Sequence, residues 1–193
     1  FDASTSNSLN DTDELTGGAG SDTLTVSATG SKTLTPQTTG IESLIVTNSS
    51  AGGTALIFNL EDEADFNALT NVSSTDDVTF NNLNSIPTLT LNTTIDTTTV
   101  NFESAALLAG TADEMTINLK GLASSTIALT SDDATGASDL ETINIVTSSA
   151  ASVLTDLQST GVDTTTVNIS GNKALTISTA LDAEVATVDA SGL

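Results

Sequence analysis

Apolar residues recur along the chain mainly as alternating pairs, in which two hydrophobic positions flank one polar position. A period of two is typical of β-strands, because successive side chains of a strand point to opposite faces. The pairs are Leu24–Val26, Leu44–Val46, Val78–Phe80, Leu89–Leu91, Val100–Phe102, Met115–Ile117–Leu119, Ile127–Leu129, Ile143–Ile145, Val167–Ile169 and Leu175–Ile177. Threonine flanks nearly every pair, and its branched Cβ suits a half-buried strand position. The pattern predicts many short strands.

The spacing of these pairs is regular in the middle of the chain. The step from Val78 to Leu89 equals the step from Leu89 to Val100. Tight hairpins between such strands usually carry Asn-Gly or Asp-Gly turns, and the sequence contains neither dipeptide. The connections therefore do not have the signature of an antiparallel meander.

Two segments recur in degenerate form. Residues 40–46 resemble residues 139–145, and residues 97–102 resemble residues 164–169. Degenerate repeats of short strands are typical of a solenoid, in which each turn buries its apolar edge against its neighbours. We therefore predict an all-β fold, a parallel β-solenoid of short Thr-rich strands, with a β-sandwich as the alternative.

Three segments depart from the strand pattern and predict short helices that cap or cross the solenoid. Residues 60–69 carry acidic side chains early, at positions 61–63, as helix N-termini often do. Residues 150–158 place apolar side chains on one helical face and are followed by a glycine. Residues 104–108 fit a third short helix.

Composition excludes much ordinary active-site chemistry. The 193 residues include no histidine, cysteine or arginine, and 25 acidic residues against three lysines give a net charge of −22. A zinc site of the usual kind, a cysteine nucleophile and a Ser-His-Asp triad are therefore absent. This charge repels nucleic acid and anionic membranes, and no apolar run approaches the ~20 residues of a membrane span. The composition predicts a cation-binding, structural protein and no enzyme.

One motif carries specific chemistry. Residues 17–25, Gly-Gly-Ala-Gly-Ser-Asp-Thr-Leu-Thr, match the calcium-binding nonapeptide G-G-x-G-x-D-x-U-x at every constrained position. Glycines such as Gly18 and Gly20 allow backbone angles that turn carbonyl oxygens inward, and Asp22 adds a carboxylate. Calcium takes six to eight such hard oxygens. These three residues are predicted calcium ligands in a β-roll turn.

A degenerate copy of the motif precedes the intact one. Asp13 precedes Asp22 by the length of one motif, and Leu15 precedes Leu24 by the same interval. Asn10 and Asp11 replace the glycines. Asp11 and Asp13 are therefore predicted to contribute to the same calcium site.

Further acidic residues stand between strand pairs, where the turns of a solenoid lie. These weaker candidate calcium ligands are Asp76, Asp77, Asp132, Asp133 and Asp139. Adjacent carboxylates in a turn can chelate calcium, although a solvated loop is the commoner explanation.

The nonapeptide, the Thr/Ser/Asn-rich alternating strands and the Ile41-Glu42-Ser43-Leu44 and Leu140-Glu141-Thr142-Ile143 segments resemble RTX-type bacterial surface-layer (S-layer) proteins. Proteins of that class leave the cell by type I secretion and form calcium-held crystalline coats. The resemblance implies an extracellular structural module on the bacterial cell surface, with Ca²⁺ as its ion. Its partners would be copies of itself, with cell-surface polysaccharide as a further partner. An RTX adhesin segment and a noncatalytic calcium domain of a secreted polysaccharide-active enzyme are the alternatives.

The domain organisation follows from the position of the motif. Residues 8–30 are predicted to be a degenerate RTX calcium-binding segment, and residues 31–193 a β-solenoid module. Asp189-Ala190-Ser191 near the end repeats Asp2-Ala3-Ser4 near the start. We therefore expect the chain to be a fragment of a longer repetitive protein.

Overall fold

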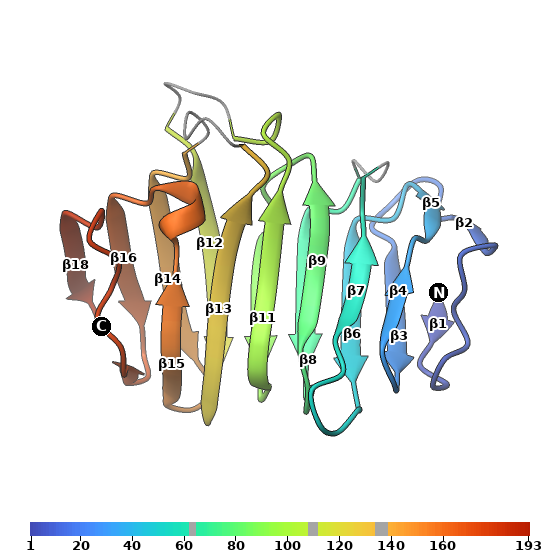
Figure 1. The fold of residues 1–193 in the computed structure, drawn as a ribbon, viewed down its shortest axis with the longest axis horizontal. Coiled ribbons are helices and arrows are strands. Elements are labelled where there is room, and N and C mark those ends of the chain that lie inside the picture. Colours follow the sequence, from blue (N-terminus) through green and yellow to red (C-terminus); the bar gives the residue numbers. More distant parts are fainter. Residues whose placement is uncertain (62–64, 108–111, 134–138) are drawn as a thin grey trace.

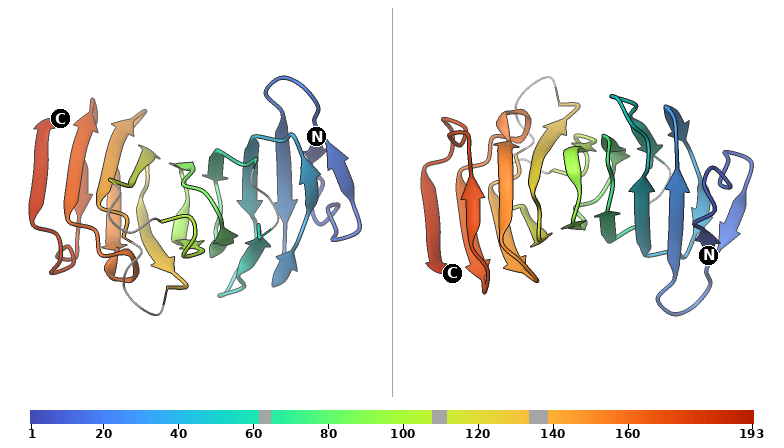
Figure 2. Two further views of the ribbon diagram at one scale, coloured as in Figure 1. Left: turned by 90° about the horizontal axis from the view of Figure 1, so that it is seen from above. Right: turned by 90° about the horizontal axis from the view of Figure 1, so that it is seen from below.

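The chain winds into a parallel β-solenoid of about seven turns (Figure 1). The structure, a computed structural model, describes residues 1–61, 65–107, 112–133 and 139–193. Each turn contributes one strand to each of two large sheets, and the strands of the two sheets run in opposite directions (Figure 1). The turns stack along the long axis, with the N-terminal strands at one end and the C-terminal strands at the other (Figure 2).

All recorded strand pairs are parallel. The nine-stranded sheet holds, in spatial order, β1 (Asp2–Ala3), β3 (Thr23–Ala28), β6 (Ser43–Asn48), β8 (Ala68–Val72), β10 (Thr88–Asn92), β12 (Glu114–Lys120), β14 (Thr142–Ser148), β16 (Thr166–Gly171) and β18 (Thr187–Gly192). The seven-stranded sheet holds β17 (Leu175–Ile177), β15 (Ser152–Gln158), β13 (Ser124–Ser131), β11 (Ile95–Phe102), β9 (Val78–Leu83), β7 (Leu56–Asn59) and β4 (Lys32–Leu34). A small third sheet pairs β2 (Glu14–Thr16) with β5 (Gln37–Thr39).

The core lies between the two large sheets and consists of stacked columns of apolar side chains. One column contains Leu24, Leu44, Leu69 and Leu89, which are in register on successive strands and fully buried. In the opposite sheet, the rings of Phe58 and Phe80 pack with centroids 6.2 Å apart. Each turn thus buries its inward-facing residues against the turns on either side, as the alternating pattern predicts.

The predicted parallel β-solenoid is confirmed. The constant step seen in the sequence is one half-turn, because Val78 lies in β9, Leu89 in β10 and Val100 in β11, and these strands alternate between the two sheets. The β-sandwich alternative requires antiparallel neighbours, and the described strands pair in parallel.

The predicted helices are wrong where the structure describes them. Residues 152–158 of the second predicted helix form β15. Its register shifts after Leu154, so both Leu154 and Leu157 are buried at a spacing of three, which imitates one face of a helix. The first predicted helix ends in β8, and the third is a turn in which Ala106 N–H donates to the carbonyl of Glu103.

Parts of two predicted helices, residues 62–64 and 108, lie outside the described residues. The helical structure that is described is a single 3₁₀ turn, Thr160–Val162. No helix in the described ranges is long and apolar enough to cross a membrane.

The recurring segments that contain Glu42 and Glu141 form the same hydrogen-bonded link between turns. Glu42 Oε2 accepts a hydrogen bond from the N–H of Asp22 at 2.7 Å, and Glu141 Oε2 accepts one from the N–H of Asp113 at 2.7 Å. The carbonyl oxygen of each glutamate also accepts two N–H groups from the following turn. The repeat is therefore structural: each glutamate joins three successive turns at one corner of the solenoid.

The predicted boundary between a calcium-binding segment, residues 8–30, and a solenoid module, residues 31–193, stays a prediction. β3, within the predicted segment 8–30, is already a member of the nine-stranded sheet. The nonapeptide at residues 17–25 therefore leads directly into the solenoid.

Candidate metal centre

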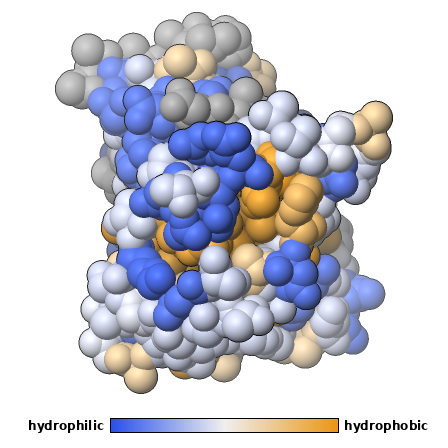
Figure 3. Space-filling model, turned by 90° about the vertical axis from the view of Figure 1, so that its right-hand side faces the viewer, coloured by the Kyte–Doolittle hydropathy of each residue, from blue (hydrophilic) through white to orange (hydrophobic). Residues whose placement is uncertain are grey.

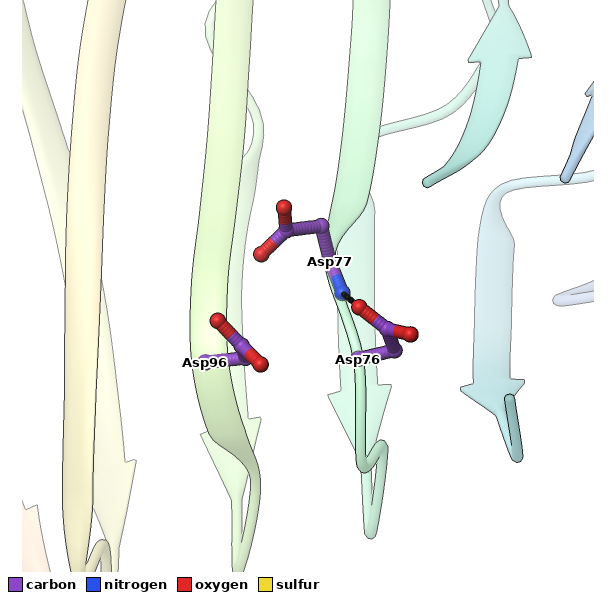
Figure 4. Close-up of side chains that lie close together, drawn as sticks. All are labelled: Asp76, Asp77 and Asp96. Atoms are coloured by element: carbon purple, nitrogen blue, oxygen red, sulfur yellow. Dashed lines mark hydrogen bonds between the residues drawn. The ribbon is translucent and has the colours of Figure 1, made fainter. Parts of the chain in front are cut away.

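Three aspartates from two successive turns come together at the N-terminal ends of β9 and β11, neighbouring strands of the seven-stranded sheet (Figure 4). Carboxylate oxygens of Asp76, Asp77 and Asp96 all lie within 4.8 Å of one another. Asp76 is buried, Asp77 is half-buried and Asp96 is exposed. In the described part of the chain this is the one group of three or more acidic side chains that meets such a distance limit.

The register of the sheet brings these residues together. Val78 of β9 lies beside Thr98 of β11, so Asp76, just before β9, lies beside Asp96, its counterpart one turn later. Asp96 has a left-handed backbone with φ of 76°, which aspartate tolerates better than most residues with a side chain. The close approach of the carboxylates thus depends on turn length and on this local backbone.

Hydrogen bonds hold two of the three carboxylates in place. Asp76 Oδ2 accepts from the N–H of Thr54 at 2.9 Å and from its hydroxyl at 3.0 Å, and Asp76 Oδ1 accepts from the N–H of Asp77. Asp77 Oδ1 accepts from the N–H of Thr97 at 3.0 Å. These donors stabilise the ionised form of each carboxylate and fix its direction.

A buried asparagine supports the same turn from inside. Asn48 is fully buried, and its Nδ2 donates to the carbonyl oxygens of Asp77 at 2.7 Å and of Thr54 at 3.0 Å. Its own backbone N–H donates to the hydroxyl of Ser74 at 2.8 Å. Asn48 therefore links the turn that carries Asp76 and Asp77 to the preceding turn, which carries Thr54.

The three aspartates are electrostatically unequal. Although Asp96 is exposed, partial desolvation of its carboxylate raises its pKa above the ordinary 3.8, and the charge of Asp77, hydrogen bonding with Asp77 and the charge of Asp76 act in the same direction. The pKa of Asp76 is lowered, chiefly because the backbone N–H of Thr54 donates to its carboxylate. In the folded state the negative charges of Asp76 and Asp77 therefore oppose ionisation of Asp96. A bound cation would reduce this repulsion.

We expect Asp96→Asn to stabilise the protein when divalent cations are absent. Because the folded pKa is raised, the folded chain keeps a proton that the unfolded chain loses, so stability falls as pH rises from 3.8 through the folded pKa. Removing the charge should therefore raise the melting temperature in chelator at neutral pH, on the order of 1–2 °C. Below pH 3.8 the parent and the variant should melt alike.

Asparagine also tolerates the left-handed backbone of Asp96, so the comparison isolates the charge. Glu184→Gln, which removes one exposed charge far along the chain, is the control. An equal rise in both variants would show that only the net charge matters.

Residues 17–22 of the nonapeptide form the turn between β2 and β3, and residues 23–25 are the first three of β3. Gly18 and Gly20 have φ of 93° and 129°, in the region that favours glycine. At Gly17 a Cβ atom would collide with the carbonyl oxygen of Gly40 in the next turn. Asp22 is half-buried, and its N–H donates to Glu42. The motif has the backbone its glycines predict, and its calcium ligation stays a prediction.

The two aspartates of the degenerate copy have separate hydrogen-bond donors. Asp11 Oδ1 accepts from the N–H of Thr35 at 2.8 Å, and Asp13 Oδ2 accepts from the N–H and the Nδ2 of Asn10, each at 3.0 Å. Together with Asp22, they form no three-carboxylate group of the kind found at Asp76 within the described ranges. A calcium ion at the motif would therefore rely on backbone oxygens as well.

The remaining predicted ligands lie near the end of β13 and before β14. Asp132 Oδ1 accepts from the N–H of Ser104 at 2.6 Å, and the N–H of Asp133 donates to the hydroxyl of Ser131. Within the described part of the chain, Asp139 Oδ1 is buried and has no hydrogen-bond partner. Burial raises the pKa of Asp139, and so do the nearby charges of Asp163, Glu141 and Asp133.

Sequence reasoning found Asp76 and Asp77 and missed Asp96. Asp96 stands alone in a threonine-rich stretch, so no local motif marks it. Asp96 follows Asp76 by the length of one turn, the same interval that separates the register partners Val78 and Thr98. The sequence alone does not reveal the length of this turn, so this interval could not be recognised in advance.

The chemistry of the ligand atoms decides which metal ions the Asp76, Asp77 and Asp96 cluster suits. Carboxylates supply only hard oxygen ligands, which fit Ca²⁺ or Mg²⁺ and not the nitrogen and sulfur preference of zinc or copper sites. The three side chains reach the site from two turns of one sheet, so an ion bound there would connect neighbouring turns.

Comparison with known proteins gives no match: neither a family model, nor a curated protein, nor a solved structure matches the chain. The functional argument therefore depends on the residues and the geometry described above.

Proposed function

We propose that the chain is a structural module of a calcium-stabilised bacterial surface protein that assembles with copies of itself. In this role the solenoid supplies a rigid, extended scaffold, and calcium neutralises the acidic groups that would keep its turns and its copies apart. The module would belong to a secreted protein of the RTX S-layer type, as the nonapeptide at residues 17–25 suggests.

The observation that carries the proposal is the cluster of Asp76, Asp77 and Asp96. Three carboxylates within 4.8 Å repel one another unless a proton or a cation is shared between them. Calcium accepts six to eight oxygen ligands in flexible geometry, so carboxylates, carbonyl groups and water can complete such a site.

The charge of the whole chain supports the same conclusion. A net charge of −22 from 25 acidic residues and three basic ones opposes close approach of identical copies. Divalent cations that bind between copies remove this barrier, because calcium can bridge oxygens from two chains. Assembly controlled by calcium is therefore the behaviour that this surface favours.

The experiment is a calcium titration of the protein followed by light scattering and negative-stain electron microscopy. Ordered assemblies should appear with millimolar calcium and dissolve on addition of chelator. Matched additions of sodium chloride separate calcium binding from general screening of charge.

Ordered assembly that is equally strong in chelator would contradict the proposal. A protein that stays monomeric in calcium and instead binds polysaccharide-coated surfaces would favour the adhesin alternative.

A further inference from the structure

The outer faces of the two large sheets differ in kind from the ends of the solenoid. The end beside β1 has an apolar middle bordered by polar residues (Figure 3). Such a surface is expected where a stack of turns ends, because the core between the sheets reaches it, and a further turn would cover it. Additional turns leave the outer faces exposed. A binding site on an outer face would therefore persist in a longer chain.

A cavity of about 450 Å³ lies on the outer side of the seven-stranded sheet, near the N-terminal ends of β11 and β13. Its volume is within the range of small-molecule binding sites, about 300–1,000 Å³. We call it the side cavity. Its lining consists of five hydroxyl-bearing residues, one acidic residue and one apolar residue: Thr97, Ser124, Ser125, Thr126, Thr155, Asp96 and Ile95.

A β-bulge shapes the side cavity. In β15, Thr155 is the extra residue, because its neighbours Leu154 and Asp156 pair with consecutive residues of β13. The hydroxyl of Thr155 forms a hydrogen bond of 2.8 Å with the hydroxyl of Ser124. A bulge bends its strand and changes the direction of the side chains beside it. The regular surface of the sheet is thus interrupted where hydroxyl groups converge.

Ile95 supplies the apolar part of the side cavity. Its side chain is 44% exposed. Away from the two ends of the chain, it is the one large hydrophobic side chain in the described ranges that is exposed. An apolar side chain next to several hydroxyl groups suits a ligand that has one apolar face and polar edges.

Asp96 connects the side cavity with the carboxylate cluster, because it belongs to both. Its strand, β11, lies between β9, which follows Asp76 and Asp77, and β13. A calcium ion at the cluster would therefore lie next to the cavity. Three carboxylates that bind through one oxygen each leave several of the six to eight ligand positions of calcium to other oxygens.

The charge of this region favours a neutral ligand. Three ionised carboxylates outweigh the two positive charges of one calcium ion, and none of the described residues that line the side cavity is a lysine. A ligand with phosphate or carboxylate groups would therefore be repelled. Neutral hydroxyl groups can bind calcium through their oxygens and can also hydrogen bond with serine and threonine.

From these features we infer that the side cavity binds a neutral saccharide, and that neighbouring hydroxyls of one sugar ring complete the coordination of calcium at the carboxylate cluster. The apolar face of the ring rests on Ile95, and its other hydroxyls contact Ser124 and Thr126. This inference rests on the proposed function, because it uses the calcium ion of that proposal, and it adds a ligand that shares the ion.

The test is saturation-transfer NMR with the methyl glycosides of mannose, galactose and glucose, each added to the protein in millimolar calcium and in chelator. At least one glycoside should bind in calcium, and chelator should weaken its binding at least about tenfold. The fully O-methylated form of that glycoside, which keeps the ring but has no hydroxyl donors, should not bind. No binding by any of the three, or equal binding in calcium and chelator, would overturn the inference.

Matched variants locate the ligand on the protein. Thr126→Val removes a hydroxyl from the side cavity and keeps a β-branched side chain, so glycoside binding should weaken about threefold to tenfold. Thr99→Val is the control, because it makes the same change on the outer face of β11 outside the cavity lining. Unchanged binding by Thr126→Val, or an equal loss in both variants, would contradict the assignment to this cavity.

The calcium-induced rise in melting temperature, measured on the same samples, separates this inference from the proposed function. A rise in melting temperature without glycoside binding contradicts the inference and leaves the proposed role of calcium in place. Calcium-dependent glycoside binding without ordered assemblies contradicts self-assembly and leaves the saccharide site in place.

Discussion

Saturating calcium is expected to raise the melting temperature of the chain by about 5 to 10 °C above its value in chelator. On the proposed function, calcium would bind the folded chain, which brings Asp76, Asp77 and Asp96 together, and not the unfolded chain, where nothing holds all three together. At 100 times the dissociation constant, one site adds about 2.7 kcal/mol to the free energy of unfolding. For a domain of this size each kcal/mol moves the melting temperature by about 2–4 °C. Calorimetry or circular dichroism measures this shift.

Single variants assign the calcium effect to a site. Asp77→Asn should reduce the calcium-induced shift if the cluster binds the ion, and Asp22→Asn should reduce it if the nonapeptide does. The shift is compared within each variant, so changes in the stability of the ion-free protein cancel. Glu184→Gln is again the charge control. Identical melts of the parent protein in calcium and in chelator would show that the acidic residues only keep the protein soluble.

Replacing Phe80 by alanine should lower the free energy of unfolding by about 3 to 5 kcal/mol, because a fully buried aromatic ring is lost. Phe80 packs against Phe58 in the preceding turn, so the cavity left by the substitution lies between turns as well as between sheets. The corresponding fall in melting temperature is about 6 to 20 °C. Urea unfolding followed by circular dichroism measures the change.

Thr79→Ala on the same strand is the matched control. Thr79 is half-buried on the outer face of β9, and its replacement should cost less than about 1 kcal/mol. If the two variants lose similar stability, the side chain of Phe80 does not lie in the core between the sheets.

The fold was predictable because burial alternates strictly along most strands of the nine-stranded sheet. In β14, Ile143 and Ile145 are fully buried while their neighbours are half-exposed, and the sequence alternates in the same way. The prediction failed at β15, where a bulge places Leu154 and Leu157 on the same side. A bulge adds one residue to a strand and changes the period from two to three, which sequence alone cannot distinguish from a helical face.

The candidate site was only partly predictable for a related reason. Adjacent aspartates such as Asp76 and Asp77 are visible in the sequence, whereas Asp96 joins them only through the register of two strands. Turn length varies along this solenoid. Leu89 lies beside Leu69 of the preceding turn and beside Ile117 of the following turn, and the second turn contains more residues than the first. Without a constant period, contacts between turns cannot be counted from the sequence.

The nine parallel strands of the larger sheet give the module a defined length. Neighbouring strands are about 4.8 Å apart, so the eight intervals in this sheet span about 38 Å along the solenoid axis. Extra residues in a loop leave this length unchanged, whereas each added turn extends it by about 4.8 Å. The number of turns therefore sets the distance between the two ends of the solenoid, in steps of one strand spacing.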